Sequence, residues 1–533
     1  MKHTLKIFAA CAFGSVLAST TLTSCNDLDT QPDNYYVTSQ EKEDAIASRP
    51  ELAKAGVVGI SSTYNQYMAV YSTAHCDFGW PGAMMMIESS GTDMVAPNTG
   101  YNWFASAGAY NFGNNNNYAN NLSWYYAYKV INSANTVLST IDADTTDPEL
   151  QLYAAQAYAN RAYVYFTLAQ LFQYTYVGHE SLPCVPILTE ENSDEAAVNG
   201  APRATVQAVY DQIMADLDKA IQLLTDSGLD VTRIADTGTT RFVSLGTAYG
   251  LRARVNLVMN KWQAAADDAA NAIAKSSCTP YSIAEASQPA FNSASDHNLM
   301  WCVFIQENDR VVTSGIVNWA SHMGSLNYGY ASVGAWRMIN KALFNTIPDT
   351  DCRKGWWLDE NRQSANLSAA QKEQAVVYGA PAYTQMKFAP YQNVLATTTN
   401  ATSFILMRIE EMYLIQAEAT AMAGGDGKSI LENFVKTYRD PSYTCPASSG
   451  QAFQDEVWRQ RRIELWGECL SYFDLLRLNK PLDRRGGGWD VDWVYNVPAP
   501  LKPLLIPNGE VQANNALGAN NDTWSKPNAV SDY

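Results

Sequence analysis

The chain has 533 residues, of which 47% are hydrophobic and 17% are charged. This balance is typical of a folded globular protein and excludes a disordered chain. The chain is too long for one compact core unless the fold is a repeat array or a large α-superhelix. Lys and Arg number 36 against 53 Asp and Glu, a formal net charge of −17 with no strong basic block. A nucleic-acid partner is therefore not expected.

The first 24 residues have the pattern of a secretory signal peptide. Lys2 and Lys6 precede an uncharged, mostly apolar run over 7–22, which is too short and too interrupted by Ser and Thr to span a membrane well. The run ends in Leu-Thr-Ser-Cys at 22–25, which resembles a bacterial lipobox. Cys25 is therefore expected to be acylated and to become the mature N-terminus, so that the mature domain runs over 25–533. The alternative is cleavage after a small residue, with Cys25 incidental.

An unusual aromatic stretch follows at 98–121, with the sequence NTGYNWFASAGAYNFGNNNNYANN. Six aromatic rings lie among asparagines and glycines, which cannot build a core around them.

Helical periodicity dominates much of the remaining chain. Residues 202–225 follow a candidate cap at Thr205 with apolar side chains at helical spacing. Residues 245–274 read as two short helices with small residues at their crossing and a tight turn between them, which is typical of a tetratricopeptide unit. Further helices are predicted at 122–140, 152–173, 404–423 and 451–478. The helix at 152–173 is apolar almost all round and is expected to be central.

The segment 276–402 differs from its surroundings. It is rich in Gly, Ser, Asn and aromatic residues and has few long helical patterns. We interpret it as a loop-rich insertion between a helical scaffold at about 40–275 and 404–480, and loops on a rigid scaffold often carry function. The segment contains a second aromatic set, VNWASHMGSLNYGY, at 317–330.

Six stretches are informative when they are taken together. They are SCNDLD at 24–29, PRATVQAVYDQIMADLDKAI at 202–221, AYGLRARVNLVMNKWQAAADDAANAI at 248–273, IPDTDCRKGWW at 347–357, RIEEMYLIQAEA at 408–419 and VWRQRRIELWGECLSYFDLLRL at 457–478. In this order they resemble the SusD/RagB family. The resemblance covers nearly the whole chain. One departure is GEC at 467–469, where a Gly-His pair is more usual.

The resemblance implies a fold, a location and a partner. It implies a mainly α protein, a tetratricopeptide-like helical superhelix with a loop-rich ligand-binding insertion. It further implies a lipid-anchored protein on the outer face of the outer membrane, which captures nutrients, chiefly glycans, and serves a SusC-like TonB-dependent transporter. The family's ligand residues vary with the substrate, so the resemblance names none here.

The aromatic stretches supply candidate ligand contacts. A sugar ring has an apolar C–H face that Trp or Tyr can cover, and hydroxyl groups that Asn can bond. The candidates are Tyr101, Asn102, Trp103 and Phe104 in the first stretch and Trp319, Tyr328 and Tyr330 in the second. The alternative is that some of these rings pack against the scaffold and others contact the transporter.

The sequence contains no pattern that indicates catalysis. A glycosidase needs two carboxylates that face the sugar, one of them with a raised pKa. Glu410 and Glu411 are adjacent and point to different helix faces, and the charged residues at 461–477 are expected to form ion pairs between helices. The histidines have no metal-ligand spacing, and neither a metal nor a cofactor is expected.

Three alternative functions are weighed against glycan capture. The same scaffold could capture a peptide or another nutrient. A tetratricopeptide adaptor could bind protein segments, but the lipobox and the aromatic loops argue against a cytosolic adaptor. A glycoside hydrolase lacks a credible carboxylate pair. Seven cysteines follow Cys25, an odd number without a CxxC pair, and most of them are expected to be buried thiols.

Overall fold

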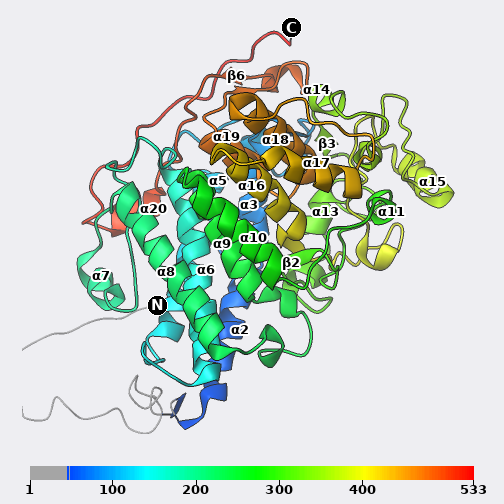
Figure 1. Ribbon diagram of the computed structural model, residues 1–533. Helices are drawn as coiled ribbons and strands as arrows, with labels where there is room; N and C mark the ends of the chain where they lie inside the picture. The colour runs from blue at the N-terminus through cyan, green and yellow to red at the C-terminus, as the bar shows by residue number, and fades with distance from the viewer. Residues whose placement is uncertain (1–44, 47, 533) are drawn as a thin grey trace, which may run out of the picture.

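A computed structural model describes residues 45–46 and 48–532 (Figure 1). The signal peptide and Cys25 therefore lie outside the described residues. The described chain is mainly α-helical with short strands, as predicted. Within it, no helix is both long enough and apolar enough to cross a membrane.

The first part of the chain contains a layer of long helices that run side by side (Figure 1). The long helices are α5 (Tyr118–Leu138), α6 (Pro148–Phe172), α8 (Val206–Ser227), α9 (Leu245–Val258) and α10 (Trp262–Lys275), and shorter helices accompany them at α2 (Ala53–Thr63), α3 (Trp80–Ser89), α4 (Ala105–Gly108) and α7 (Ser193–Asn199). The predicted cap of α8 is confirmed, because Thr205 Oγ1 accepts a hydrogen bond from the Ala208 N–H at 3.1 Å. The predicted pair of short helices at 245–274 is also present, as α9 and α10.

Helix α6 lies at the centre of this layer, as its apolar surface predicts. Every side chain from Leu150 to Phe172 is buried except that of Tyr158. Its one buried cation, Arg161, donates to both carboxylate oxygens of Asp216 on α8 at 2.8 Å. A charge in the middle of a buried helix is tolerated because its partner is supplied by the neighbouring helix.

The segment 276–402 contains only short elements. They are α11 (Ile283–Ala286), β2 (Leu299–Val303), α12 (Arg310–Thr313), α13 (Trp319–Met323), β3 (Met338–Ile339), α14 (Lys341–Phe344) and α15 (Ala369–Tyr378). It lies beside the long helices, on the right in Figure 1. Strand β2 pairs antiparallel with β4 (Phe404–Arg408), with Leu299 opposite Arg408 and Val303 opposite Phe404. This pairing ties the segment to the start of the last helical part.

The last part returns to helices. It comprises α16 (Ile409–Met422), α17 (Gly427–Tyr438), α18 (Gly450–Glu464), α19 (Ser471–Arg477), β5 (Leu482–Asp483), β6 (Asn496–Val497) and α20 (Asn508–Ala513), with β5 and β6 paired antiparallel. Two predicted helices differ from the structure. Residues 404–408 form β4 because they pair with β2, and the helix predicted at 451–478 is broken after Glu464. Gly467 and Cys469 adopt left-handed φ values of 77° and 62° in the break, which a continuous helix cannot accommodate.

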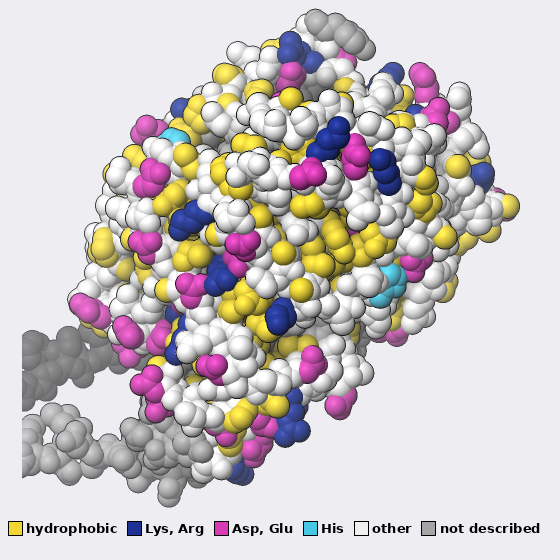
Figure 2. Space-filling view, in the orientation of Figure 1, with side chains coloured by type: hydrophobic (Ala, Val, Ile, Leu, Met, Phe, Trp, Pro, Cys, Tyr) yellow, Lys and Arg dark blue, Asp and Glu magenta, His cyan; other side chains and the backbone are white. Residues whose placement is uncertain are grey.

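The seven described cysteines are all free thiols, as expected. Five are buried and two, Cys278 and Cys352, are partly exposed. On the surface, the face shown in Figure 2 has Lys and Arg side chains scattered among Asp and Glu. That face has no concentrated positive patch of the kind that contacts with phosphate require.

Candidate functional site

Two short strands bring the two aromatic segments together. β1 (Met94–Val95) pairs antiparallel with β3, with Met94 opposite Ile339 and Val95 opposite Met338. In an antiparallel pair, the chain that leaves one strand and the chain that enters the other lie at the same end of the ribbon. The segments 96–104 and 328–337 therefore meet there, although they are distant in sequence.

A chain of contacting rings lies where these segments meet, and it consists of Trp103, His75, Tyr330 and His322. The Trp103 ring lies on the His75 ring, with centroids 4.8 Å apart and planes 19° from parallel. His75 Nδ1 is hydrogen-bonded to the Tyr330 hydroxyl, and Tyr330 stacks on His322 at 4.5 Å and 11°. Tyr330 and His322 are buried, whereas Trp103 and His75 are partly exposed. The buried rings thus hold the outer two in place, and part of the Trp103 side chain stays exposed to solvent.

Asn102 stabilises the loop around Trp103 through hydrogen bonds on its buried side. Its side chain is buried, and its Oδ1 accepts from the Phe104 N–H at 3.1 Å and from Arg337 Nη2 at 3.3 Å. Its Nδ2 donates to the Pro97 carbonyl at 3.0 Å. Asn102 was predicted as a ligand contact, but these bonds and its burial make it a residue that positions Trp103.

Tyr101 and Tyr328 are the most exposed of the predicted rings. Their exposed fractions are 56% and 46%, which leaves much of each ring free. Tyr101 lies against the turn that follows Tyr330, since a Cβ added to Gly334 would be 3.6 Å from Tyr101 Cδ2. The backbone of Tyr328 is held by Thr397 and Asn400. The structure thus places Tyr101 beside the stacked rings, whereas Tyr328 is anchored to a neighbouring loop.

Two predicted contacts, Phe104 and Trp319, lie in the core instead. Phe104 is 0% exposed and meets the edges of Phe78 and His322. Trp319 is 2% exposed and packs edge-to-face with Phe388 at 5.0 Å and Phe404 at 5.9 Å. Neither ring has a free face on which a sugar could stack, so the prediction that they contact the ligand is wrong and both are structural residues.

Sequence reasoning missed His75 and Arg337. Neither lies in an aromatic or asparagine-rich pattern of its own, and only the β1–β3 pairing and the loop after α2 bring them to the site. Arg337 is fully buried beneath the loop, with its guanidinium 5.6 Å from the Phe104 ring centroid. The Trp-Arg pair at 336–337, just before β3, was the one available signal, and it is indistinguishable from ordinary core packing.

The stacked rings are uncharged at neutral pH. Burial lowers the pKa of His75, and burial together with the nearby Arg337 holds the pKa of His322 well below its ordinary value, so both imidazoles are neutral. Burial raises the pKa of Tyr330, partly opposed by a hydrogen bond with Trp103, so the hydroxyl keeps its proton. A surface of neutral rings and hydroxyls suits an uncharged ligand with apolar C–H faces.

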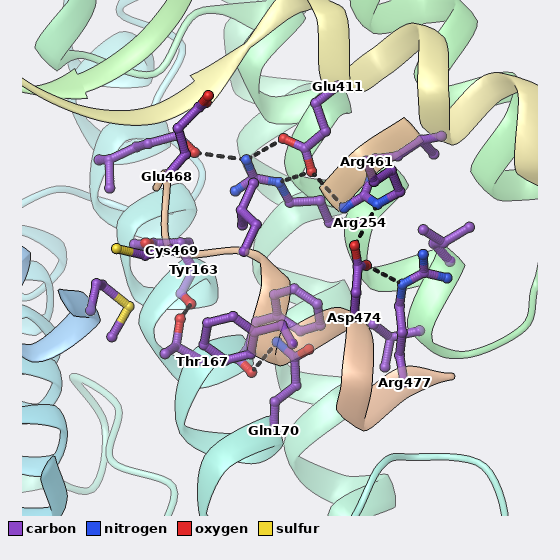
Figure 3. Close-up of a pocket in the computed structure, with 18 of the residues that line it drawn as sticks. Tyr163, Thr167, Gln170, Arg254, Glu411, Arg461, Glu468, Cys469, Asp474 and Arg477 are labelled. Carbon is purple, nitrogen blue, oxygen red and sulfur yellow. Dashed lines mark hydrogen bonds and ion pairs between the residues drawn. The ribbon is translucent and has the colours of Figure 1, made fainter. Parts of the chain in front are cut away.

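A separate pocket of about 60 Å³ lies between α6, α9, α16, β4 and α19 (Figure 3). Its acidic residues are paired with arginines. Asp474 accepts from Arg461 Nε at 2.8 Å and from Arg477 Nε at 2.7 Å, and Glu411 accepts from Arg254 Nε at 2.9 Å. Burial alone would raise the pKa of Asp474, but the two arginines hold it below its ordinary value. The predicted ion pairs of the segment 461–477 are therefore confirmed, and these carboxylates have a structural role.

Glu88 is the buried carboxyl whose chemistry most resembles that of a catalytic acid. Burial, with a smaller effect of Asp93, raises its pKa to about 8. However, its side chain is 0% exposed on α3, and it accepts one hydrogen bond from Ser471 Oγ at 3.1 Å. A carboxyl with no exposed atom has no access to a glycosidic bond, so we interpret Glu88 as a core residue that is protonated at neutral pH.

Glu88 makes the stability of the protein depend on pH. Its folded-state pKa lies above the unfolded value of about 4.3, so its contribution is retained at low pH and lost as pH rises from about 4.5 to 8. We expect Glu88→Gln to match the wild type at pH 5 and to exceed its unfolding free energy by roughly 3 kcal/mol at pH 8. Thermal unfolding at both pH values measures this. The exposed Glu373→Gln on α15 is the control, and an equal gain in that variant would contradict the prediction.

Comparisons with known proteins all point to the same family. Two family models match the chain, one described as "Starch-binding associating with outer membrane" over residues 58–257 and one as "SusD family" over residues 357–524. SusD-like protein P2 of Formosa agariphila is 24% identical over 74% of this chain and 79% of its own length.

Solved structures share the fold. A SusD-like carbohydrate binding protein from Bacteroides vulgatus superposes with a TM-score of 0.70 at 21% identity, covering 88% of this chain and 97% of that one. The surface glycan-binding protein A from Bacteroides thetaiotaomicron, in complex with laminarihexaose, has a TM-score of 0.61 at 15% identity, covering 89% and 99%. At these identities the structures establish the fold alone.

Proposed function

This chain belongs to the SusD/RagB family, and from that premise we propose that it is a glycan-binding protein of the cell surface. The observation that carries the proposal is Trp103, held on His75 with part of its ring exposed, beside the exposed Tyr101. The similar protein of B. thetaiotaomicron was solved with a hexasaccharide, which supports the same class of ligand.

Binding rests on stacking and neutral hydrogen bonds. Trp103 and Tyr101 cover the C–H faces of a sugar, and the hydroxyl of Tyr328, on the neighbouring loop, bonds its edge. Asn102 and Tyr330 hold Trp103 in place from below. Because these groups are uncharged at neutral pH, the ligand that they favour is a neutral oligo- or polysaccharide.

The proposal includes a location and a partner. Family membership and the match to an outer-membrane starch-binding family support association with the outer membrane. We propose that Cys25 is the lipidated N-terminus, that the domain faces the cell exterior, and that it passes glycan to a SusC-like TonB-dependent transporter. A β-barrel partner should copurify from membranes solubilised in mild detergent.

The lipid anchor can be tested directly. We expect Cys25→Ala to release the protein from membranes or leave it unprocessed, because one acylated cysteine with several chains provides the hydrophobic anchor. Membrane fractionation and mass spectrometry of the mature N-terminus measure this. Ser24→Ala, which keeps a small residue before the cysteine, is the control. Normal anchoring of the Cys25 variant would exclude this lipid attachment.

A panel of glycans and peptides tests the function as a whole. Mature wild-type protein is titrated by calorimetry with neutral oligosaccharides, including laminarihexaose, with uronic-acid oligosaccharides and with peptides, and the glycan mixtures are assayed for new reducing ends. Binding to a neutral glycan without release of reducing ends supports the proposal. Binding only to peptides would favour peptide capture or an adaptor, and released reducing ends would establish a hydrolase.

A further inference from the structure

A stripe of tyrosines and asparagines runs along the outer face of α5, away from the stacked rings at Trp103. Its members are Tyr118, Asn121, Tyr125, Tyr128 and Asn132. Spacings of three, four, three and four residues place side chains one above another on a single helix face. Four of these side chains are partly exposed, and the fifth, that of Asn132, is exposed.

Two cavities lie along this stripe. One, of about 640 Å³, is bounded by Gln66, Val70 and Tyr125, and the other, of about 410 Å³, is bounded by the segments at α7 and α20. Tyr128 and Asn132 line both cavities, so the two are adjacent on α5, and together they are called the α5 groove. Helix α20 is tied to the end of α7 because Asn514 Nδ2 donates to the Ala201 carbonyl at 2.9 Å. Both helices lie at the same edge of the helical layer (Figure 1).

The rings in this groove are held in place. The Tyr128 hydroxyl donates to the Pro186 carbonyl at 2.8 Å, and its ring leans on the buried Trp124 at 4.8 Å. Tyr125 is partly exposed, and its hydroxyl lies against the start of α20, since a Cβ added to Gly509 would be 2.5 Å from Tyr125 Oη. A fixed ring loses little conformational entropy when a ligand stacks on it. The groove therefore has preorganised apolar contact surface.

Three amide side chains are free to bond a ligand there. Asn132, Asn199 and Asn515 all line the 410 Å³ cavity, and all are exposed. In the described part of the chain, none of the three side chains makes a hydrogen bond to another residue. Each amide offers both donors and an acceptor, which matches the hydroxyl groups of a sugar.

The charges in the groove are already engaged. Lys129 donates to Gln66 Oε1 at 3.1 Å, and Glu510 accepts from Asn514 Nδ2 at 3.0 Å. One cation and one anion at opposite parts of the groove provide no net charge for a charged ligand. Fixed rings, free amides and balanced charge together favour an uncharged, polyhydroxylated ligand.

We propose that the α5 groove is a second carbohydrate-binding site, which takes a neutral oligosaccharide segment. This inference rests on the proposed function for the class of ligand, but not on the residues of the first site. A polysaccharide long enough to reach both sites would be held by two contacts at once, which raises its overall affinity above that of either site.

The test uses the mature full-length protein and affinity electrophoresis in gels cast with laminarin, starch, xylan or galactomannan, with alginate as the anionic comparison. The test variant is Asn132→Ala/Asn199→Ala/Asn515→Ala, in which only exposed side chains are shortened. The control is Thr136→Ala, an exposed position one turn further along α5 and outside both cavities. The third protein is Trp103→Ala, which removes the first site.

We expect the triple variant to bind the retarding neutral polysaccharide tenfold or more weakly than wild type, since three hydrogen bonds are lost. The Thr136→Ala control should match wild type, and the triple variant combined with Trp103→Ala should lose the residual binding of either. Equal retardation of the triple variant and the control overturns the second site while leaving the proposed function intact. Unchanged glycan binding with loss of the copurifying transporter overturns it in favour of a protein interface. No retardation of wild type in any neutral gel overturns both proposals.

Discussion

Replacing Glu464 by Gln is expected to remove about 3–5 kcal/mol from the free energy of unfolding, because it unbalances a buried ion cluster. Glu464 accepts from Arg439 Nε at 2.7 Å and from Arg353 and Arg408 at 3.2 and 3.3 Å. The full cluster has four cations, Arg353, Lys387, Arg408 and Arg439, and four anions, Asp351, Glu410, Glu464 and Glu468. None of the eight side chains is more than 4% exposed. The variant leaves four cations against three anions where water cannot compensate.

A second substitution makes this prediction specific. Arg439→Gln alone should destabilise by a similar amount, since it leaves three cations against four anions. The double variant Glu464→Gln/Arg439→Gln restores equal numbers, and we expect it to be clearly more stable than the sum of the two losses predicts. Thermal unfolding of the four proteins measures the coupling, and strict additivity would contradict the charge-balance argument.

An exposed pair provides the control for the cluster. The Asp455 side chain is 44% exposed and pairs with Lys480 at 2.6 Å. We expect Asp455→Asn to change the unfolding free energy by less than about 1 kcal/mol, because exposed pairs are solvated and screened.

The cluster also sets a dependence on pH that differs from that of Glu88. Burial alone would raise the pKa of Glu464, but Arg439, Arg408 and Arg353 hold it far below its ordinary value. A group with a depressed folded pKa contributes stability above its unfolded pKa of about 4.3 and loses it as pH falls towards the folded pKa. The difference between wild type and Glu464→Gln should therefore be largest above pH 5 and should shrink at more acid pH.

The sequence predicted the helices because their signals are local. The Thr205 cap and the apolar stripe behind it lie within one segment, and so do the two halves of the pair at 245–274. β4 was missed because the strand exists only through its partner at 299–303, about a hundred residues away. When the partner strand is not known, an apolar run next to a helix is predicted to continue that helix.

The candidate site was predicted only in part, for the same physical reason. The segment at 101–104 was correctly singled out as unusual, but its alternating exposure depends on what packs behind it. Trp103 stacks on His75 and is partly exposed, whereas Phe104 contacts Phe78 and His322 and is fully buried. These neighbours come from distant segments, so composition alone could not separate ligand rings from core rings. The same holds for Trp319, which packs between Phe388 and Phe404.

Trp103→Ala should weaken binding of a neutral glycan by tenfold or more without a comparable loss of stability. Stacking on a sugar contributes apolar area at about 25 cal/mol per Å² in addition to a stacking preference of roughly 0.5–1.5 kcal/mol, and 1.4 kcal/mol corresponds to tenfold in affinity. Because Trp103 lies at the surface end of the stack, its removal leaves the buried contacts of Tyr330 and His322 in place. Calorimetric titration with laminarihexaose, or with whichever neutral glycan the panel identifies, measures the change.

Two other tryptophans separate a binding role from a structural one. Trp458 is partly exposed on α18 with Arg462 4.7 Å from its ring centroid, and Trp458→Ala should leave glycan affinity unchanged. Trp319→Ala opens a cavity in the core, and we expect a loss of about 3–5 kcal/mol in unfolding free energy. If Trp103→Ala instead lowered the melting temperature as Trp319→Ala does, or kept full affinity, Trp103 would be a structural residue. The exposed rings of Tyr101 and Tyr328 would then be the remaining candidates for the binding surface. Since the rings are neutral, affinity should also be constant between pH 6.5 and pH 8.5 and nearly insensitive to salt.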